Sequence, residues 1–243
     1  GSMKNLKKNR AIRIVCLLNW LFVLCLQGSL TMAQSDSVVY RFKEGEVLDL
    51  LFLTQKPGTK ELFNDYMKTA VPVGEALSYR PVASFRVNEN LQGNYQPELL
   101  ILAKWDDIDK REAFLNDIEG EVPDFHERRR SIWSSFGLTY YEMPADVNFV
   151  VHKDKFKVLT AYWSEKAKPF KQFKEQWLQQ AESSGGTVSL LMEEGISPLG
   201  YFYQPDLFII TEWDSQESFE RFHRLNLKMN HEGVKHVNQM AIN

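Results

Sequence analysis

Cysteine is nearly absent from this sequence of 243 residues, and the two that occur, Cys16 and Cys25, lie close to the N-terminus. Everything after residue 33 therefore contains no thiol. This excludes a cysteine nucleophile, a thiolate metal site, a redox-active pair and a stabilising disulfide from that part of the chain. Its stability must come from a hydrophobic core, for which the remaining length is sufficient.

Several other signatures are missing as well. The formal net charge is only −3 and there is no extended basic tract, which argues against a nucleic-acid partner. No phosphate-binding glycine loop and no serine-nucleophile elbow occurs. The five histidines never take a metal-binding spacing, since even His231 and His236 miss the four-residue helical repeat. We therefore expect no metal site.

The N-terminus has the pattern of a secretory signal. Gly1-Ser2 before Met3 resembles an expression-tag remnant, and a lysine- and arginine-rich start precedes the apolar run 14–26. Thr31-Met32-Ala33 then supplies a cleavage site before Gln34. The run is shorter than the roughly 20 apolar residues of a spanning helix, although an uncleaved anchor is the alternative. We expect residues 1–33 to be remnant plus signal peptide, and the mature protein to be periplasmic or extracellular and free of the membrane.

Two stretches of the remaining chain resemble each other. Residues 96–114 and 204–222 each contain an apolar strand that ends in Trp-Asp and runs into an amphipathic helix. At a constant offset of 108 (204 − 96), Gln96, Pro97, Leu99, Ile101, Trp105, Asp106, Glu112 and Phe114 recur as Gln204, Pro205, Leu207, Ile209, Trp213, Asp214, Glu220 and Phe222. The flanking patterns recur in the same order. This predicts two tandem repeats, residues 34–147 and 148–243.

Each repeat is predicted to run strand–helix–strand–strand–helix, with a final helix over 231–240. That order suits an α+β fold, in which an antiparallel ferredoxin-like sheet carries helices on one face. The strands at 99–102 and 207–210 are apolar at successive positions, so neither sheet face can remain in water. We therefore expect the open faces of the two repeats to pack together as one pseudo-dimeric α/β barrel within a monomer, with further oligomerisation left open.

The run Ile210-Thr211-Glu212-Trp213-Asp214-Ser215, followed by Phe219, Phe222 and later His231, resembles the strand–helix signature of dimeric α/β-barrel proteins. That superfamily includes antibiotic-biosynthesis-type monooxygenases, haem-degrading monooxygenases and NIPSNAP-like proteins. The resemblance implies a small hydrophobic or aromatic ligand in a cleft between sheet and helices, with cofactor-independent monooxygenase or isomerase chemistry as one extension. The alternative is a non-catalytic carrier or protein-interaction module with a filled barrel.

The same resemblance bears on haem. In haem-degrading relatives a histidine after the second helix ligates iron; His231 lies near that position, and His126 is its approximate counterpart in the first repeat. Haem binding or degradation is thus a minor alternative, in which both histidines are candidate catalytic residues. The relatives have tryptophan where this chain has Phe114 and Phe222, so our first expectation is no cofactor. The two phenylalanines would contact a ligand, and the histidines would otherwise lie on a helix surface or form hydrogen bonds.

Asp49 is the third candidate catalytic residue, because it is a carboxylate in an otherwise apolar strand, with Thr160 at the expected equivalent position. Facing the interior, it would be a candidate acid or base; at a strand edge or paired with a lysine or arginine, it would not. Thr160 is expected to contact a ligand, as are Trp105 and Trp213, whose alternative is core packing. The run Arg128-Arg129-Arg130 is either a solvated helix face or an anion-binding site.

Overall fold

The computed structural model describes residues 36–243. The expected signal peptide, 1–33, and its cleavage site lie outside the described residues. The strands are β1 (Ser37–Phe42), β2 (Val47–Gln55), β3 (Arg80–Gln92), β4 (Leu99–Trp105), β5 (Trp133–Glu142), β6 (Val147–His152), β7 (Phe156–Ser164), β8 (Thr187–Glu193), β9 (Leu207–Trp213) and β10 (Val234–Ile242), and the helices are α2 (Lys60–Thr69), α3 (Val71–Ala76), α4 (Ile108–Glu121), α5 (Phe125–Ile132), α6 (Ala167–Ser183) and α7 (Gln216–Asn226). Over this part of the chain, no helix combines the length and the apolar character that crossing a membrane requires.

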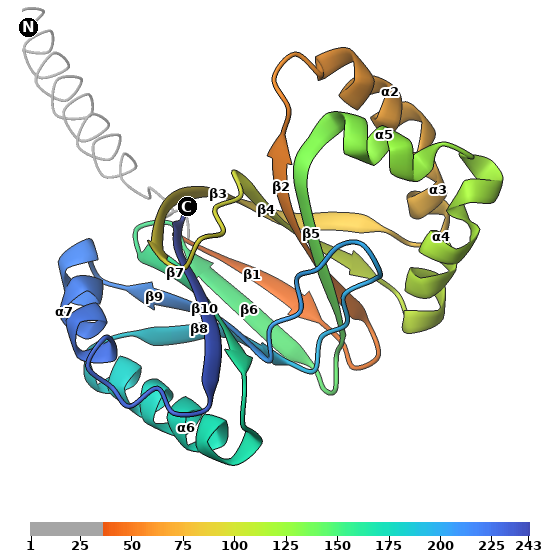
Figure 1. The fold of residues 1–243 in the computed structure, drawn as a ribbon. Helices are drawn as coiled ribbons and strands as arrows, with labels where there is room; N and C mark the ends of the chain where they lie inside the picture. The colour runs from red at the N-terminus through yellow and green to blue at the C-terminus, as the bar shows by residue number, and fades with distance from the viewer. Residues whose placement is uncertain (1–35) are drawn as a thin grey trace, which may run out of the picture. The chain divides into compact units, whose positions relative to one another are not determined.

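The described chain has two halves with the same order of elements. The first runs β2-α2-β3-β4-α4-β5, with the short helices α3 and α5 added, and the second runs β7-α6-β8-β9-α7-β10. Their strands pair in corresponding orders, β5-β2-β4-β3 and β10-β7-β9-β8, and β3 pairs with β10 to give one antiparallel sheet of eight strands. The helices of each half cover the outer face of its own strands (Figure 1). The expected α+β architecture of ferredoxin-like repeats is confirmed.

Side chains of the central strands are buried on both faces of the sheet. On β2, Leu48, Leu50 and Phe52 point into a core shared by both halves, whereas Asp49 and Leu51 point toward the helices. The shared core fills the barrel interior with residues of both halves, among them Leu48, Leu50, Phe52, Leu100, Leu102, Leu159, Ala161, Phe208, Ile210 and Met240, and the β1–β6 ribbon adds Phe42 and Phe149. Burial on two faces explains the consecutive apolar residues of these strands.

The segment after β8 closes the barrel against β5. Tyr140 and Ile196 exchange two backbone hydrogen bonds of 2.9 Å, and the Thr139 hydroxyl donates to the carbonyl of Tyr203. Residue 195 has to be glycine in this close approach, because a Cβ there would lie 2.5 Å from the Thr139 methyl group. β5 is an edge strand of the eight-stranded sheet, and this segment covers its free edge.

One expectation about an individual element is wrong. Residues 231–240 do not form a helix, since β10 begins at Val234 and is inserted between β7 and β3. Hydrogen bonding to two neighbouring strands overrides the local preference of the segment. The helix α2 ends at Thr69 and is followed directly by α3. Pro72 is tolerated there because the N–H groups of a first helical turn have no partner within the helix.

Candidate ligand-binding site

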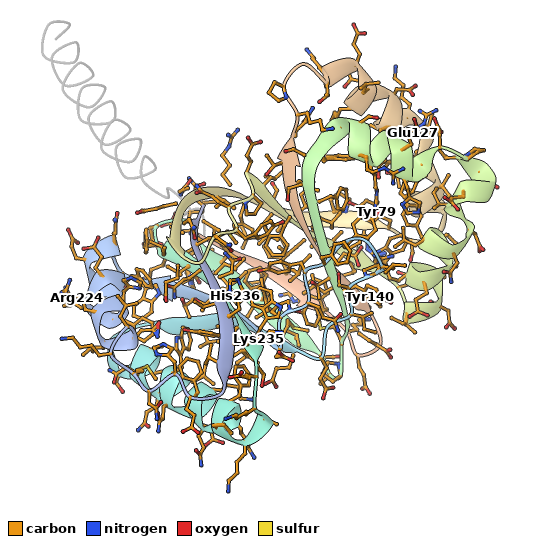
Figure 2. The ribbon with its side chains drawn as sticks, viewed as in Figure 1. Tyr79, Glu127, Tyr140, Arg224, Lys235 and His236 are labelled. Carbon is orange, nitrogen blue, oxygen red and sulfur yellow. The ribbon has the colours of Figure 1, made fainter. Side chains whose placement is uncertain are left out.

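A cavity of about 250 Å³ lies between the sheet of the first half and its helices. Most of its wall is apolar and comprises Leu51, Leu53, Phe63, Met67, Ala70, Val71, Ile101, Phe114, Trp133, Phe136 and Leu138. Tyr79, which also lines it, and the neighbouring Tyr140 can be located in Figure 2. Small-molecule sites commonly measure roughly 300–1,000 Å³, so this cavity suits a ligand of about one or two aromatic rings.

Asp49 and Arg111 form a buried ion pair in the wall of this cavity. One carboxylate oxygen of Asp49 accepts from Arg111 Nε at 2.6 Å, and the other accepts from Trp105 Nε1 at 3.0 Å. The side chains of both ionised residues are no more than 4% exposed. The Asp107 side chain caps the start of α4 by accepting from the Lys110 N–H, which fixes the turn that carries Arg111. Of the alternatives for Asp49, the structure shows pairing with an arginine.

Arg129 of α5 also lines the cavity, and it is only 8% exposed. Its Nε donates to the Tyr66 hydroxyl at 3.0 Å and its Nη1 to the Tyr201 hydroxyl at 2.7 Å. The guanidinium carbon lies 4.3 Å from the ring centroids of both Phe125 and Phe136. Within residues 36–243, no carboxylate forms an ion pair with Arg129.

The run Arg128-Arg129-Arg130 therefore does not form one solvated helix face. Arg128 makes surface ion pairs with Asp65 and Asp124, and Arg130 is exposed. Consecutive residues of an α-helix are turned by about 100°, so one member of such a run can point inward while its neighbours face water. In α5 the inward member is Arg129.

Two phenols near the ion pair remain protonated at neutral pH. Burial, together with the charge of Asp49, raises the pKa of Tyr79 to about 12. Burial and a hydrogen bond that its hydroxyl donates to Glu112 at 3.0 Å raise the pKa of Tyr140 to about 12. Tyr79 can thus donate a hydrogen bond in the cavity but cannot act there as a base.

The structure does not bring the two candidate histidines together. His126 borders a hollow next to the cavity, and its Nδ1 lies 3.2 Å from the Tyr201 hydroxyl. Burial, and then the charge of Arg129, lowers the pKa of His126. His231 lies in the second half, before β10, with its ring centroid 5.2 Å from that of Phe173. Over the part of the chain that is described, no cluster of three or more His, Asp or Glu residues could hold a metal ion.

The corresponding space of the second half is filled by aromatic side chains. Trp177 of α6 is fully buried and meets the ring of Phe222 edge-on at 5.3 Å. Phe222 in turn stacks on Trp213, with centroids 5.0 Å apart. The Trp213 indole donates to the Thr211 hydroxyl at 3.0 Å instead of to a carboxylate. Trp213 and Phe222, both expected at a ligand site, are core residues here.

Strand pairing corrects the expected equivalence of Asp49 and Thr160. Asp49 pairs with Ala103 on β4; the residue 108 positions later, Thr211, pairs with Val158. Val158 is therefore the counterpart of Asp49. The expected equivalence with Thr160 was two residues out of register, so Val158 and Thr160 lie on the same face of the strand. Thr160 itself is fully buried, and its hydroxyl accepts from the Gln239 side chain at 3.0 Å. Of the expected ligand-binding residues, Trp105 and Phe114 line the cavity.

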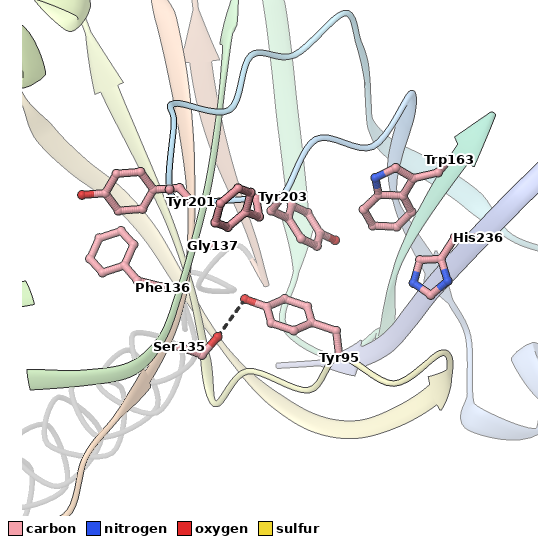
Figure 3. Close-up of a pocket in the computed structure, with 10 residues that line it drawn as sticks. Tyr95, Ser135, Phe136, Gly137, Trp163, Tyr201, Tyr203 and His236 are labelled. Carbon is pink, nitrogen blue, oxygen red and sulfur yellow. Dashed lines mark hydrogen bonds between the residues drawn. The ribbon is translucent and has the colours of Figure 1, made fainter. Parts of the chain in front are cut away.

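A larger hollow of about 510 Å³ lies where the two halves meet (Figure 3). Its aromatic wall includes Tyr95, whose hydroxyl accepts from Ser135 at 3.4 Å, and Trp163, whose ring lies 5.0 Å from that of His236. The residues that line it include no Asp, Glu, Lys or Arg. It lacks the buried charges that distinguish the smaller cavity.

Comparison with known proteins gives structural neighbours alone. No family model and no curated protein matches the chain. An anthrone oxidase-like protein is 14% identical over 84% of this chain and 94% of its own, with a TM-score of 0.42. A candidate monooxygenase from Fusobacterium nucleatum is 10% identical (83% and 93% covered, TM-score 0.42), and a chlorite dismutase variant from Candidatus Nitrospira defluvii is 9% identical (83% and 93% covered, TM-score 0.45).

These neighbours share the ferredoxin-like α/β arrangement, and at 14% identity or less the likeness is one of fold alone. The likeness lies in the arrangement of strands and helices. The chemistry of this site has to come from its own residues.

Reasoning from the sequence missed Arg111 and Tyr201 as members of the site. Arg111 had a usable signal, because the second repeat has Phe219 at the matching helical position. Arg129 was visible only as part of a basic run. Tyr201 had no signal, since it comes from the loop between β8 and β9 and its hydrogen bond to Arg129 spans 72 residues of chain.

Proposed function

We propose that this protein binds a small, predominantly apolar ligand of about one or two rings in the cavity of its first half. The observation that carries the proposal is the contrast between the halves. The same layer of sheet and helices is filled by Trp177 and Phe222 in the second half but encloses about 250 Å³ in the first. Protein interiors are normally packed without such space, so an apolar cavity with a few buried polar groups is the best candidate for a ligand site.

The proposal is for binding and does not extend to turnover. A general base needs a free oxygen or nitrogen within reach of the substrate. Both oxygens of Asp49 already accept hydrogen bonds from Arg111 and Trp105, and Tyr79 has a pKa of about 12. Monooxygenase chemistry, as in the names of some structural neighbours, or isomerase chemistry would need a buried base, and the remaining carboxylate of the lining, Glu75, is exposed to solvent.

Haem is not part of the proposal either. An iron porphyrin needs four pyrrole rings of space, more than a cavity for one or two rings provides. His126 points its Nδ1 at Tyr201, and His231 packs on Phe173 in the other half. Neither histidine is placed to ligate an iron between the sheet and helices of the first half.

We further propose that the protein is exported and works as a monomer. The basic start, the apolar run and the site before Gln34 support export. One chain supplies all eight strands of the sheet, which supports the monomer. N-terminal sequencing of protein from its native host should give Gln34 as the first residue. An intact Met3 on a cytoplasmic product would contradict export.

Calorimetric titration with 2-naphthamide, a neutral two-ring probe, tests the proposed cavity. The wild type should bind it saturably, and Met67→Trp should abolish binding without lowering the melting temperature. Met67 lines the cavity and is 43% exposed, so it can be enlarged with little strain. Leu62→Trp, on the outer face of the same helix, is the matched control.

Native mass spectrometry of protein purified from its own host provides the independent readout. A retained small molecule that Met67→Trp fails to retain would support the proposal. Absence of any saturable binding and of any retained molecule in the wild type would refute it, and so would binding that is unaffected by Met67→Trp.

A further inference from the structure

Arg129 carries a buried positive charge that no carboxylate of the described chain balances. Its two hydrogen-bond partners, Tyr66 and Tyr201, are neutral hydroxyls. The faces of Phe125 and Phe136 stabilise the cation but leave its charge in place. A guanidinium has five N–H donors, and among the described residues only two of them have an acceptor, so donors remain for a ligand. Burial of an unpaired charge is costly, and a bound anion would remove that cost.

The unpaired charge lies at one end of the cavity. Phe136, Leu138 and Tyr140 share one face of β5 because side chains alternate along a strand. Arg129 lies over the Phe136 ring at 4.3 Å, and Arg111 over the Tyr140 ring at 4.7 Å. Four residues of strand, roughly 13 Å, separate these rings, and Leu138 between them lines the cavity. Arg111 has its carboxylate partner, and the remaining carboxylate of the lining, Glu75, is exposed to solvent, so Arg129 is the buried charge of this cavity that has no partner of opposite sign.

We infer that the ligand of this cavity is a monocarboxylic acid with an apolar body of one or two rings. The inference rests on the proposed function and specifies its ligand class. The carboxylate accepts charge-assisted hydrogen bonds from the free N–H groups of Arg129. The apolar body lies along Leu138 toward the ion pair at Asp49, where a second acidic group would meet no free cation. A phosphate monoester, with close to two charges, exceeds the single positive charge that is available.

Titration with 2-naphthoate and with 2-naphthamide, its neutral isostere, tests the inference on the full-length mature protein. The wild type should bind the acid at least about tenfold more tightly than the amide, as expected for a charge-assisted hydrogen bond in a buried site. Arg129→Gln should bring that ratio close to one while binding of the amide persists. Arg129→Lys, which retains the charge, should retain most of the preference. Arg130→Gln, a change at the exposed neighbour, is the matched control and should behave as the wild type.

The outcomes separate this inference from the proposed function. If the wild type binds both probes equally, the inference of a carboxylic acid ligand is refuted and the proposed apolar site stands. If Arg129→Gln retains the preference, another cation holds the acid and the assignment to Arg129 is refuted. If neither probe binds, the proposed function fails and this inference fails with it. Should Arg129→Gln not fold, the wild-type ratio still decides for or against an acid, and perturbation of the Arg129 Nε–H NMR signal by the acid alone decides the residue.

Discussion

Arg111 and Phe219 occupy the same position in the two halves of this protein, each four residues after the N-cap of its helix. Arg111 pairs with Asp49, whereas Phe219 and Val158, the counterpart of Asp49, both belong to an apolar core. The same fold is therefore built at these positions both with and without an ion pair. The pair marks the half that contains the cavity and is not required by the architecture.

This relationship makes the second half a template for substitution in the first. Asp49→Val or Arg111→Phe alone should lower the free energy of unfolding by roughly 3–5 kcal/mol, because each leaves one buried charge without its partner. The double variant, which introduces the apolar pair of the second half, should recover most of this loss and retain a deficit of about 1–3 kcal/mol, because the buried Trp105 N–H loses its acceptor. Urea unfolding of all four proteins gives the coupling energy directly. A double variant as unstable as the sum of the single ones would show that the pair has a structural role beyond its own charges.

The sequence predicted those parts of the fold that are determined within one repeat. The strands at 99–105 and 207–213 were predicted from their apolar runs, because they are buried on both faces and end in the repeated Trp-Asp. The last strand was not, since its polar residues Asn238 and Gln239 become buried only between two neighbouring strands. For a segment of this kind, tertiary pairing decides between helix and strand.

The residues of the candidate site also divide into those that one repeat determines and those that depend on both halves. Asp49, Trp105 and Phe114 come from adjacent elements of one repeat, and reasoning from the sequence singled out all three. The contact of Arg129 with Tyr201 joins α5 to a loop that follows β8. No periodicity or motif records such a contact, because it depends on how the two halves close on each other.

Tyr141 and Tyr203 are two buried tyrosines inside the barrel that differ in the hydrogen bonding of their hydroxyl groups. Both are buried, but the Tyr203 hydroxyl donates to Asn238 at 3.1 Å, whereas no partner for the Tyr141 hydroxyl occurs among residues 36–243. Tyr203→Phe should cost about 1 kcal/mol of unfolding free energy, and Tyr141→Phe should be neutral or stabilising. Thermal and urea unfolding check both. A loss of stability in Tyr141→Phe equal to that in Tyr203→Phe would contradict the assignment.

Each half needs the other to cover its inner sheet face. Leu159, Phe208 and Ile210 of the second half point into the shared core. Residues 148–243 expressed alone should therefore self-associate or aggregate, because that face would be exposed to water. Size-exclusion chromatography with light scattering measures the outcome, with the chain from residue 34 onward as control. A soluble, monomeric half would show that the shared core is dispensable.

The pKa of His126 predicts a dependence of stability on pH. Burial lowers this pKa in the folded state, so between the folded pKa and the unfolded value near 6.5 the unfolded chain binds more protons. Stability should therefore fall as the pH is lowered below about 6.5. His126→Gln should make the decline from pH 7 to pH 5 shallower, although His223, whose pKa burial also lowers, keeps part of it. Urea midpoints at each pH test this, with the exposed His236→Gln as control, and an unchanged slope in His126→Gln would contradict it.

Haem provides the last test, because the resemblance to haem-degrading proteins and the geometry of this site lead to opposite expectations. The cavity is sized for one or two rings, and His126 and His231 lie outside it in different halves. Titrating haem into the mature protein should therefore give no saturable Soret band above that of free haem. His126→Ala and His231→Ala should leave this result unchanged, since neither imidazole is positioned to ligate iron inside the cavity. A saturable band in the wild type that one of these substitutions abolishes would reverse the conclusion, identify the half that binds haem, and require the first half to open far beyond the volume that its apolar side chains now enclose.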